Sequence, residues 1–234
     1  MCQVTNRRHL RDAGYPGRRS KVEMLTVLDH AGVVVFAATG ALAASRKQLD
    51  IIGFLFFAAA TGVGGGTLRD LILGKVPVFW VVDPTYILVC VVTGIVVFFI
   101  AHLIEWRYRL LIWLDAIGLS AYCVMGAAIG LVATQSATIA IITGTLTATC
   151  GGVLRDMLAD EPSVLLRSEI YISAALAGAC TFTGLEGLDF PTYASSSAGF
   201  VVAFALRGGA IHFQWSIPRY HPRAGRDPDD ALKR

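Results

Sequence analysis

Gly64-Gly65-Gly66-Thr67-Leu68-Arg69-Asp70 returns further along the chain as Cys150-Gly151-Gly152-Val153-Leu154-Arg155-Asp156, with Gly65 and Gly151 86 positions apart. The same offset relates four more pairs, which are Asp29 and Asp115, Gly32 and Gly118, Gly40 and Gly126, and Thr61 and Thr147. Glycine-interrupted apolar segments at matching places in two halves indicate a transport site near the membrane midplane. The chain is therefore predicted to be one structural unit built twice.

The composition indicates a membrane protein with several spans. Of 234 residues, 55% are hydrophobic and only 16% are charged, and the mean hydropathy is +0.60, whereas soluble domains carry more charge. A helix needs about 20 apolar residues to cross a bilayer. Seven runs meet this length, at residues 25–44, 51–73, 84–104, 110–132, 137–159, 168–187 and 192–212. We expect an all-α membrane fold of seven transmembrane helices.

The spans divide into two repeats and an added helix. Because each repeat holds three spans, an odd number, the second repeat must enter the membrane from the opposite side, so the repeats are inverted. The predicted units are a basic, disordered arm at 1–23, the repeats at 24–108 and 109–188, the seventh helix at 189–218, and a disordered tail at 219–234.

Basic residues in short loops predict the orientation, since such loops tend to stay in the cytoplasm. The first, third and fifth loops hold Arg46, Lys47, Arg107, Arg109 and Arg167. We therefore expect the N-terminus outside and the C-terminus in the cytoplasm. The net charge of +3 comes with no basic patch interleaved with aromatic residues, so no nucleic-acid partner is expected.

The glycines of the second and fifth spans predict a break in each helix. Each glycine weakens a helix by about 1 kcal/mol relative to alanine, and a short helix capped by Thr67 would begin after the first break. The freed carbonyl groups and nearby hydroxyl groups could replace the hydration shell of a small cation. The alternative for the glycines is close helix packing through small faces. The candidate residues are Gly64, Gly65, Gly66, Gly151, Gly152, Thr61, Thr147 and Thr149.

Four ionisable residues follow the glycines, namely Arg69, Asp70, Arg155 and Asp156. Charged groups at membrane depth are costly and by default indicate function. In the structural alternative they join the repeats, with Arg69 pairing with Asp156 or Asp115, and Arg155 pairing with Asp70 or Asp29. Asp29 and Asp115 are accordingly expected to be structural charge partners. The glycine-rich stretches match no dinucleotide or phosphate loop, so neither an enzyme nor a cofactor is expected.

The duplicated Gly-Gly-Gly-x-x-Arg-Asp motif, the Asp-x-x-Gly openings at Asp29 and Asp115, and Pro77-Val78-Phe79-Trp80 resemble the prokaryotic branch of the trimeric intracellular cation (TRIC) channels. The resemblance runs from about Asp29 to Pro218. It implies a homotrimer in membrane lipid, with helices 2 and 5 kinked at the glycines around a water-filled pore in each protomer.

The resemblance also implies the location, which is the plasma membrane of a prokaryote, and the permeant species, which is a monovalent cation, chiefly K⁺. Because the sequence shows no signature selectivity filter, we expect K⁺ to be favoured over Na⁺ without strong exclusion. No metal site beyond the permeant ion is expected. Because the same sequence group has been associated with glycine transport, a secondary transporter for a small amino acid such as glycine stays open as the alternative.

Overall fold

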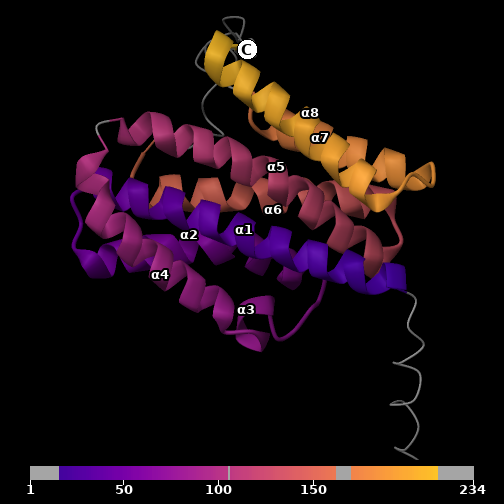
Figure 1. Ribbon diagram of the computed structural model, residues 1–234, viewed down its shortest axis with the longest axis horizontal. Coiled ribbons are helices and arrows are strands. Elements are labelled where there is room, and N and C mark those ends of the chain that lie inside the picture. Colours follow the sequence, from indigo (N-terminus) through magenta and orange to yellow (C-terminus); the bar gives the residue numbers. More distant parts are fainter. Residues whose placement is uncertain (1–15, 105, 162–169, 216–234) are drawn as a thin grey trace, which may run out of the picture.

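The computed structural model describes residues 16–104, 106–161 and 170–215, with side chains described from Asp29 onward. Within these ranges every regular element is a helix. The elements are α1 (Pro16–Arg46), α2 (Ile51–Ile72), α3 (Phe79–Val82), α4 (Thr85–Ile100), the short 3₁₀ helix η1 (Ala101–Leu103), α5 (Arg107–Thr134), α6 (Ala137–Leu158), α7 (Ile172–Gly187) and α8 (Thr192–Phe213). Figure 1 shows α7 and α8 along one side of the bundle, with α3 and α4 on the opposite side.

Each predicted span overlaps one helix of 16 or more residues, and these helices are α1, α2, α4, α5, α6, α7 and α8. Among the described residues, five segments are long and apolar enough to cross a membrane, which are Ile51–Ile72, Thr85–Leu103, Arg107–Thr134, Ala137–Leu158 and Thr192–Phe213. α7, with 16 residues, is shorter than the roughly 20 residues that a full span needs. Two features differ from the prediction. The helix α1 begins at Pro16, before the predicted first span, and the short helix α3 precedes α4. Hydropathy marks the apolar part of a helix rather than its end, and proline suits a first helical turn.

The two segments predicted to be disordered, 1–23 and 219–234, lie mostly outside the described residues. Residues 16–23 are helical as the start of α1, whereas 1–15 and 216–234 lie outside the described ranges.

The glycines of the two repeats pack helix against helix. A Cβ atom on Gly65 of α2 would overlap the carbonyl oxygen of Thr147 in α6, and one on Gly151 would lie 3.0 Å from the carbonyl oxygen of Thr61. Residue numbers thus rise along α2 as they fall along α6, so the two helices run in opposite directions where they cross. This is the contact pattern that inverted repeats produce about a pseudo-two-fold axis.

The same symmetry relates α1 and α5. Phe36 and Tyr122, also 86 positions apart, stack with ring centroids 5.0 Å apart. Gly32 lies against the Tyr122 ring, and Gly118 lies against the Phe36 ring. The aromatic pair therefore occupies the centre of the bundle, and each ring needs a glycine on the facing helix.

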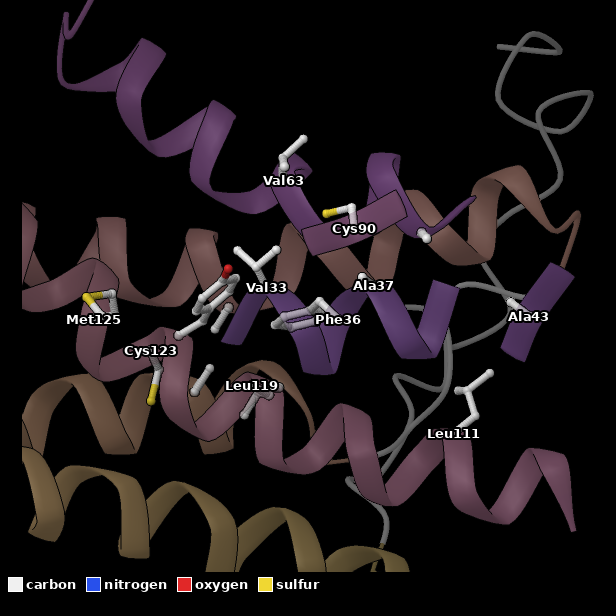
Figure 2. Packing of buried hydrophobic residues seen from close by; sticks show 14 of the residues in the cluster. Val33, Phe36, Ala37, Ala43, Val63, Cys90, Leu111, Leu119, Cys123 and Met125 are labelled. Atoms are coloured by element: carbon white, nitrogen blue, oxygen red, sulfur yellow. The ribbon is translucent and has the colours of Figure 1, made fainter. Parts of the chain in front are cut away.

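The hydrophobic core surrounds this pair. Figure 2 shows Val33, Phe36 and Ala37 of α1 between Cys90 of α4 and Leu119 of α5, and all five are fully buried. α1 is thus packed between α4 of its own repeat and α5 of the second repeat.

The predicted division of the second and fifth spans into two helices each is wrong. α2 and α6 are continuous α-helices through their glycines. The Thr67 hydroxyl donates to the carbonyl oxygen of Val63 over 2.7 Å and caps no new helix. In lipid, freed carbonyl groups would lack water partners, and backbone contacts at Gly65 and Gly151 offset the low helix propensity of glycine. The alternative of close packing through small faces is confirmed at these two positions, while a kink stays a prediction.

Candidate functional site

Arg155 is the centre of a buried ion-pair cluster in the second repeat. Its Nη1 lies 2.7 Å from Oδ1 of Asp115, and its Nη2 lies 2.9 Å from Oδ1 of Asp156. The three residues are between 2% and 6% exposed. Asp115 belongs to α5, whereas Arg155 and Asp156 belong to α6. The cluster therefore ties two helices of one repeat together, and the predicted pairing of Arg155 with Asp70 or Asp29 is wrong.

Arg69 occupies the matching position in the first repeat, with a different environment. Its Nε lies 2.9 Å from Oδ1 of Asp70, and its guanidinium carbon lies 5.5 Å from the centroid of the Phe79 ring. The other oxygen of Asp70 accepts a hydrogen bond from the Phe79 backbone N–H over 2.9 Å. The predicted partners Asp156 and Asp115 are therefore wrong for Arg69 as well, because its ion pair lies within its own helix.

Asp29 does not repeat the role of Asp115. Its Oδ2 accepts a hydrogen bond from the Tyr86 hydroxyl over 2.8 Å, and the Tyr86 ring stacks on His30 and contacts Phe79 edge to face. The repeat pattern does not identify Tyr86, because the position 86 residues further along the chain holds no tyrosine. Asp29 and Arg69 thus join one network through two aromatic rings.

The segment around α3 covers the first cluster. The Phe79 ring lies against Gly66, where a Cβ would come 2.6 Å from a ring carbon, and the Trp80 indole Nε1 donates to the Thr67 hydroxyl over 2.9 Å. The motif Pro77 to Trp80 therefore folds back onto the end of α2 that carries Arg69.

Replacing Thr67 by valine should detach Trp80 from α2. The variant loses the acceptor of the indole N–H, so the free energy of unfolding should fall by about 1 kcal/mol. Thr145→Val is the control, because the Thr145 hydroxyl bonds only a carbonyl oxygen of its own helix, that of Ile141. Thermal unfolding of the purified protein in detergent measures both, and equal melting temperatures for the two variants would contradict the role of the indole bond.

The three threonines predicted to line a polar route have different partners. Thr147 donates to the carbonyl oxygen of Thr143 over 2.5 Å, and Thr149 donates to that of Thr145 over 2.9 Å. The Thr61 hydroxyl is fully buried and has no hydrogen-bond partner within the described part of the chain. Thr61 is thus the threonine of this set whose hydroxyl has no acceptor among the described residues, and its oxygen lies at Gly40 of α1, where an added Cβ would come within 2.6 Å.

The two clusters lie on opposite sides of the helix crossing. Arg69 and Arg155 each follow their crossing glycine by four residues, which is about 6 Å along a helix. Because α2 and α6 run in opposite directions, these displacements point away from each other. The order through the molecule is therefore one cluster, the glycine crossing, and the other cluster.

A small cavity adjoins the second cluster. Its volume is about 20 Å³, and its lining includes Asp115, Arg155, Asp156, Glu161 and Arg207. That space holds about one water molecule. A larger cavity of about 350 Å³ lies between α5 and α8. Both cavities are lined in part by Tyr108, Ile112 and Arg207.

Comparison with known proteins gives matches over most of the chain. A family described as glycine transporters matches residues 26–102 and 112–186. A UPF0126 membrane protein of Vibrio cholerae is 35% identical over 201 residues, 84% of this chain and 83% of that protein. The UPF0126 inner membrane protein YadS of Escherichia coli is 36% identical over 198 residues, 82% of this chain and 94% of that protein.

Solved structures match as well. The TRIC trimeric intracellular cation channel orthologue from Rhodobacter sphaeroides has a TM-score of 0.80 and 48% identity, covering 82% of this chain and 99% of that one. A prokaryotic TRIC channel in 0.5 M KCl has a TM-score of 0.78 and 26% identity, covering 84% and 100%. These neighbours are channels rather than enzymes.

Proposed function

We propose a function for this chain, which belongs to the membrane-protein family described as glycine transporters and resembles the prokaryotic TRIC channels. The function is passive conduction of monovalent cations, chiefly K⁺, through a polar pathway inside each protomer. The family name of the Rhodobacter sphaeroides protein describes a trimer, and the active form proposed here is likewise a homotrimer, in the plasma membrane of a prokaryote.

The observation that carries this proposal is the pair of buried Arg–Asp clusters on either side of the glycine crossing. Each repeat places two carboxylates in the cluster of one arginine. In the first repeat these are Asp29 and Asp70 with Arg69. In the second they are Asp115 and Asp156 with Arg155. This composition favours cations over anions in each cluster, and arginines held by carboxylates bind no anion. A polar group with an excess of carboxylates at membrane depth also lowers the cost of bringing a cation there.

Conduction requires the helices to separate at the crossing. The backbones of α2 and α6 meet at Gly65 and Gly151, so the crossing is closed in this structure. Bending at the glycines would part the helices and expose the backbone carbonyl groups of the crossing, such as those of Thr61 and Thr147, to water. The kink predicted from the sequence then belongs to the open conformation.

The orientation follows from the basic loops. The loops with Arg46, Lys47, Arg107 and Arg109 lie at the same end of the bundle as the Arg155 cluster, since Arg46 pairs with Glu161 just after α6. We assign this end to the cytoplasm by the distribution of positive charge, and the α3 end to the outside.

Secondary transport of glycine is the second candidate, favoured by the description of the matching family and by the suitability of inverted repeats for alternating access. Here an arginine would bind the carboxylate of glycine and an aspartate its amine. The two functions differ in rate, because a carrier must change conformation for every substrate molecule.

Planar-bilayer recording of the purified protein should distinguish the candidates. With KCl gradients we expect unitary currents that reverse near the K⁺ equilibrium potential, with smaller currents in NaCl. Saturable uptake of radiolabelled glycine into proteoliposomes, without unitary currents, would instead establish the carrier.

A further inference from the structure

Arg46, at the end of α1, joins three elements at the end of the bundle nearest the second cluster. Its Nη1 lies 3.0 Å from Oε2 of Glu161, just after α6, with side-chain exposures of 30% and 17%. Its guanidinium carbon lies 4.6 Å from the centroid of the Tyr108 ring, in the first turn of α5. The contact therefore fixes the ends of α1, α5 and α6 relative to one another.

These residues stand at the cavity beside the ion-pair cluster. Glu161 and Tyr108 line the cavity of about 20 Å³ together with Asp115, Arg155 and Asp156. A space for about one water molecule cannot pass a hydrated ion. Cations that approach the second cluster past Glu161 would therefore displace its partner Arg46.

The inverted repeat lacks an equivalent pair at the other end. The positions that correspond to Arg46 and Glu161 by the 86-residue offset are Val132 and Lys75, which cannot form an ion pair. The Arg46–Glu161 contact is thus a property of one mouth and is not required by the duplicated fold.

The described charged residues that line this cavity, taken together with Arg46, are equal in number of each sign while the pair is closed. Asp115 and Asp156 face Arg155, and Arg207, 3% exposed, adds a second positive charge to the lining of the same cavity. Glu161 is neutralised by Arg46. Releasing Arg46 leaves the Glu161 carboxylate as the excess negative charge, so separation of the pair both widens the entrance and makes it attractive to cations.

We propose that the Arg46–Glu161 pair, supported by the Tyr108 ring, is a latch that closes this mouth, and that Glu161, once released, is a specificity-determining residue that concentrates cations there. The inference rests on the proposed channel function. Arg46 acts on opening alone, whereas Glu161 acts on opening and on the choice between cations and anions.

Single-channel recording of the full chain in asymmetric KCl tests this assignment with Arg46→Gln and Glu161→Gln. Partly exposed ion pairs and cation–π contacts are weak, so each variant should raise the open probability about threefold or more. Only Glu161→Gln should lower the K⁺-to-Cl⁻ permeability ratio, seen as a shift of the reversal potential toward zero. Lys47→Gln and Asp160→Asn, which change exposed neighbours, should match the wild type in both quantities.

The charge-exchanged double variant Arg46→Glu with Glu161→Arg addresses effects on folding. It restores an ion pair, so its open probability should return toward the wild-type value. Unchanged open probability in both single variants, or equal shifts of the reversal potential in both, would overturn the latch. An absence of cation current in the wild-type protein would instead overturn the proposed function.

Discussion

Gly65→Ala should lower the free energy of unfolding by about 3 kcal/mol, the upper range for an added methyl group in a closely packed site. The new Cβ would overlap the carbonyl oxygen of Thr147, and both groups belong to backbones of crossing helices. Neither can move without shifting α2 against α6. The variant should also lose cation current, because the shift displaces the Arg–Asp clusters on both sides of the crossing. Thermal unfolding in detergent and bilayer recording measure the two effects.

Gly64→Ala is the matched control in the same helical turn. Its Cβ would meet only the Cδ1 atom at the end of the Leu154 side chain, which is 37% exposed and can rotate away. Gly151→Ala should be intermediate, since its Cβ would lie 3.0 Å from the Thr61 carbonyl oxygen and 3.1 Å from Phe36. A melting temperature as low for Gly64→Ala as for Gly65→Ala would show that overlap with the crossing backbone does not set the loss, because the change to alanine by itself favours the helix.

The helix crossing could be predicted in part from the sequence. The 86-residue offset identifies which glycines are equivalent, and an odd number of spans in each repeat predicts the antiparallel arrangement that Gly65 and Gly151 show. The offset does not say whether two equivalent glycines break their helices or bring them together. That choice depends on the facing backbone, here the carbonyl groups of Thr61 and Thr147, which belongs to the other repeat in each case.

The ion pairs could not be predicted from spacing. Adjacent residues on a helix point in directions about 100° apart, and pairing is expected three or four positions along. Arg69 nevertheless reaches Asp70, and Arg155 reaches Asp156, because the long arginine side chain turns back within the buried space. The difference between the repeats depends on Tyr86, which takes the Asp29 carboxylate, and on Phe79, whose ring covers Arg69. Neither residue belongs to the repeated pattern.

Arg155→Gln should lower the free energy of unfolding by about 3–5 kcal/mol, which is the usual result of removing one partner from a buried ion pair. The variant leaves two carboxylates, on Asp115 and Asp156, buried without their cation. Asp115→Asn combined with Arg155→Gln removes one of these charges and lets amide groups bond each other, so the double variant should recover a large part of the loss.

Arg69→Gln should cost less than Arg155→Gln although the two arginines are equivalent by sequence. Asp70 keeps its hydrogen bond from the Phe79 backbone N–H, and Asp29 keeps the Tyr86 hydroxyl, so neither carboxylate loses every donor. Thermal unfolding of both variants in the same detergent compares the clusters directly. If the two losses are equal and Asp115→Asn gives no rescue, then Arg155 is not held by its two carboxylates, and the clusters cannot supply the arrangement of charges on which cation passage is proposed to depend.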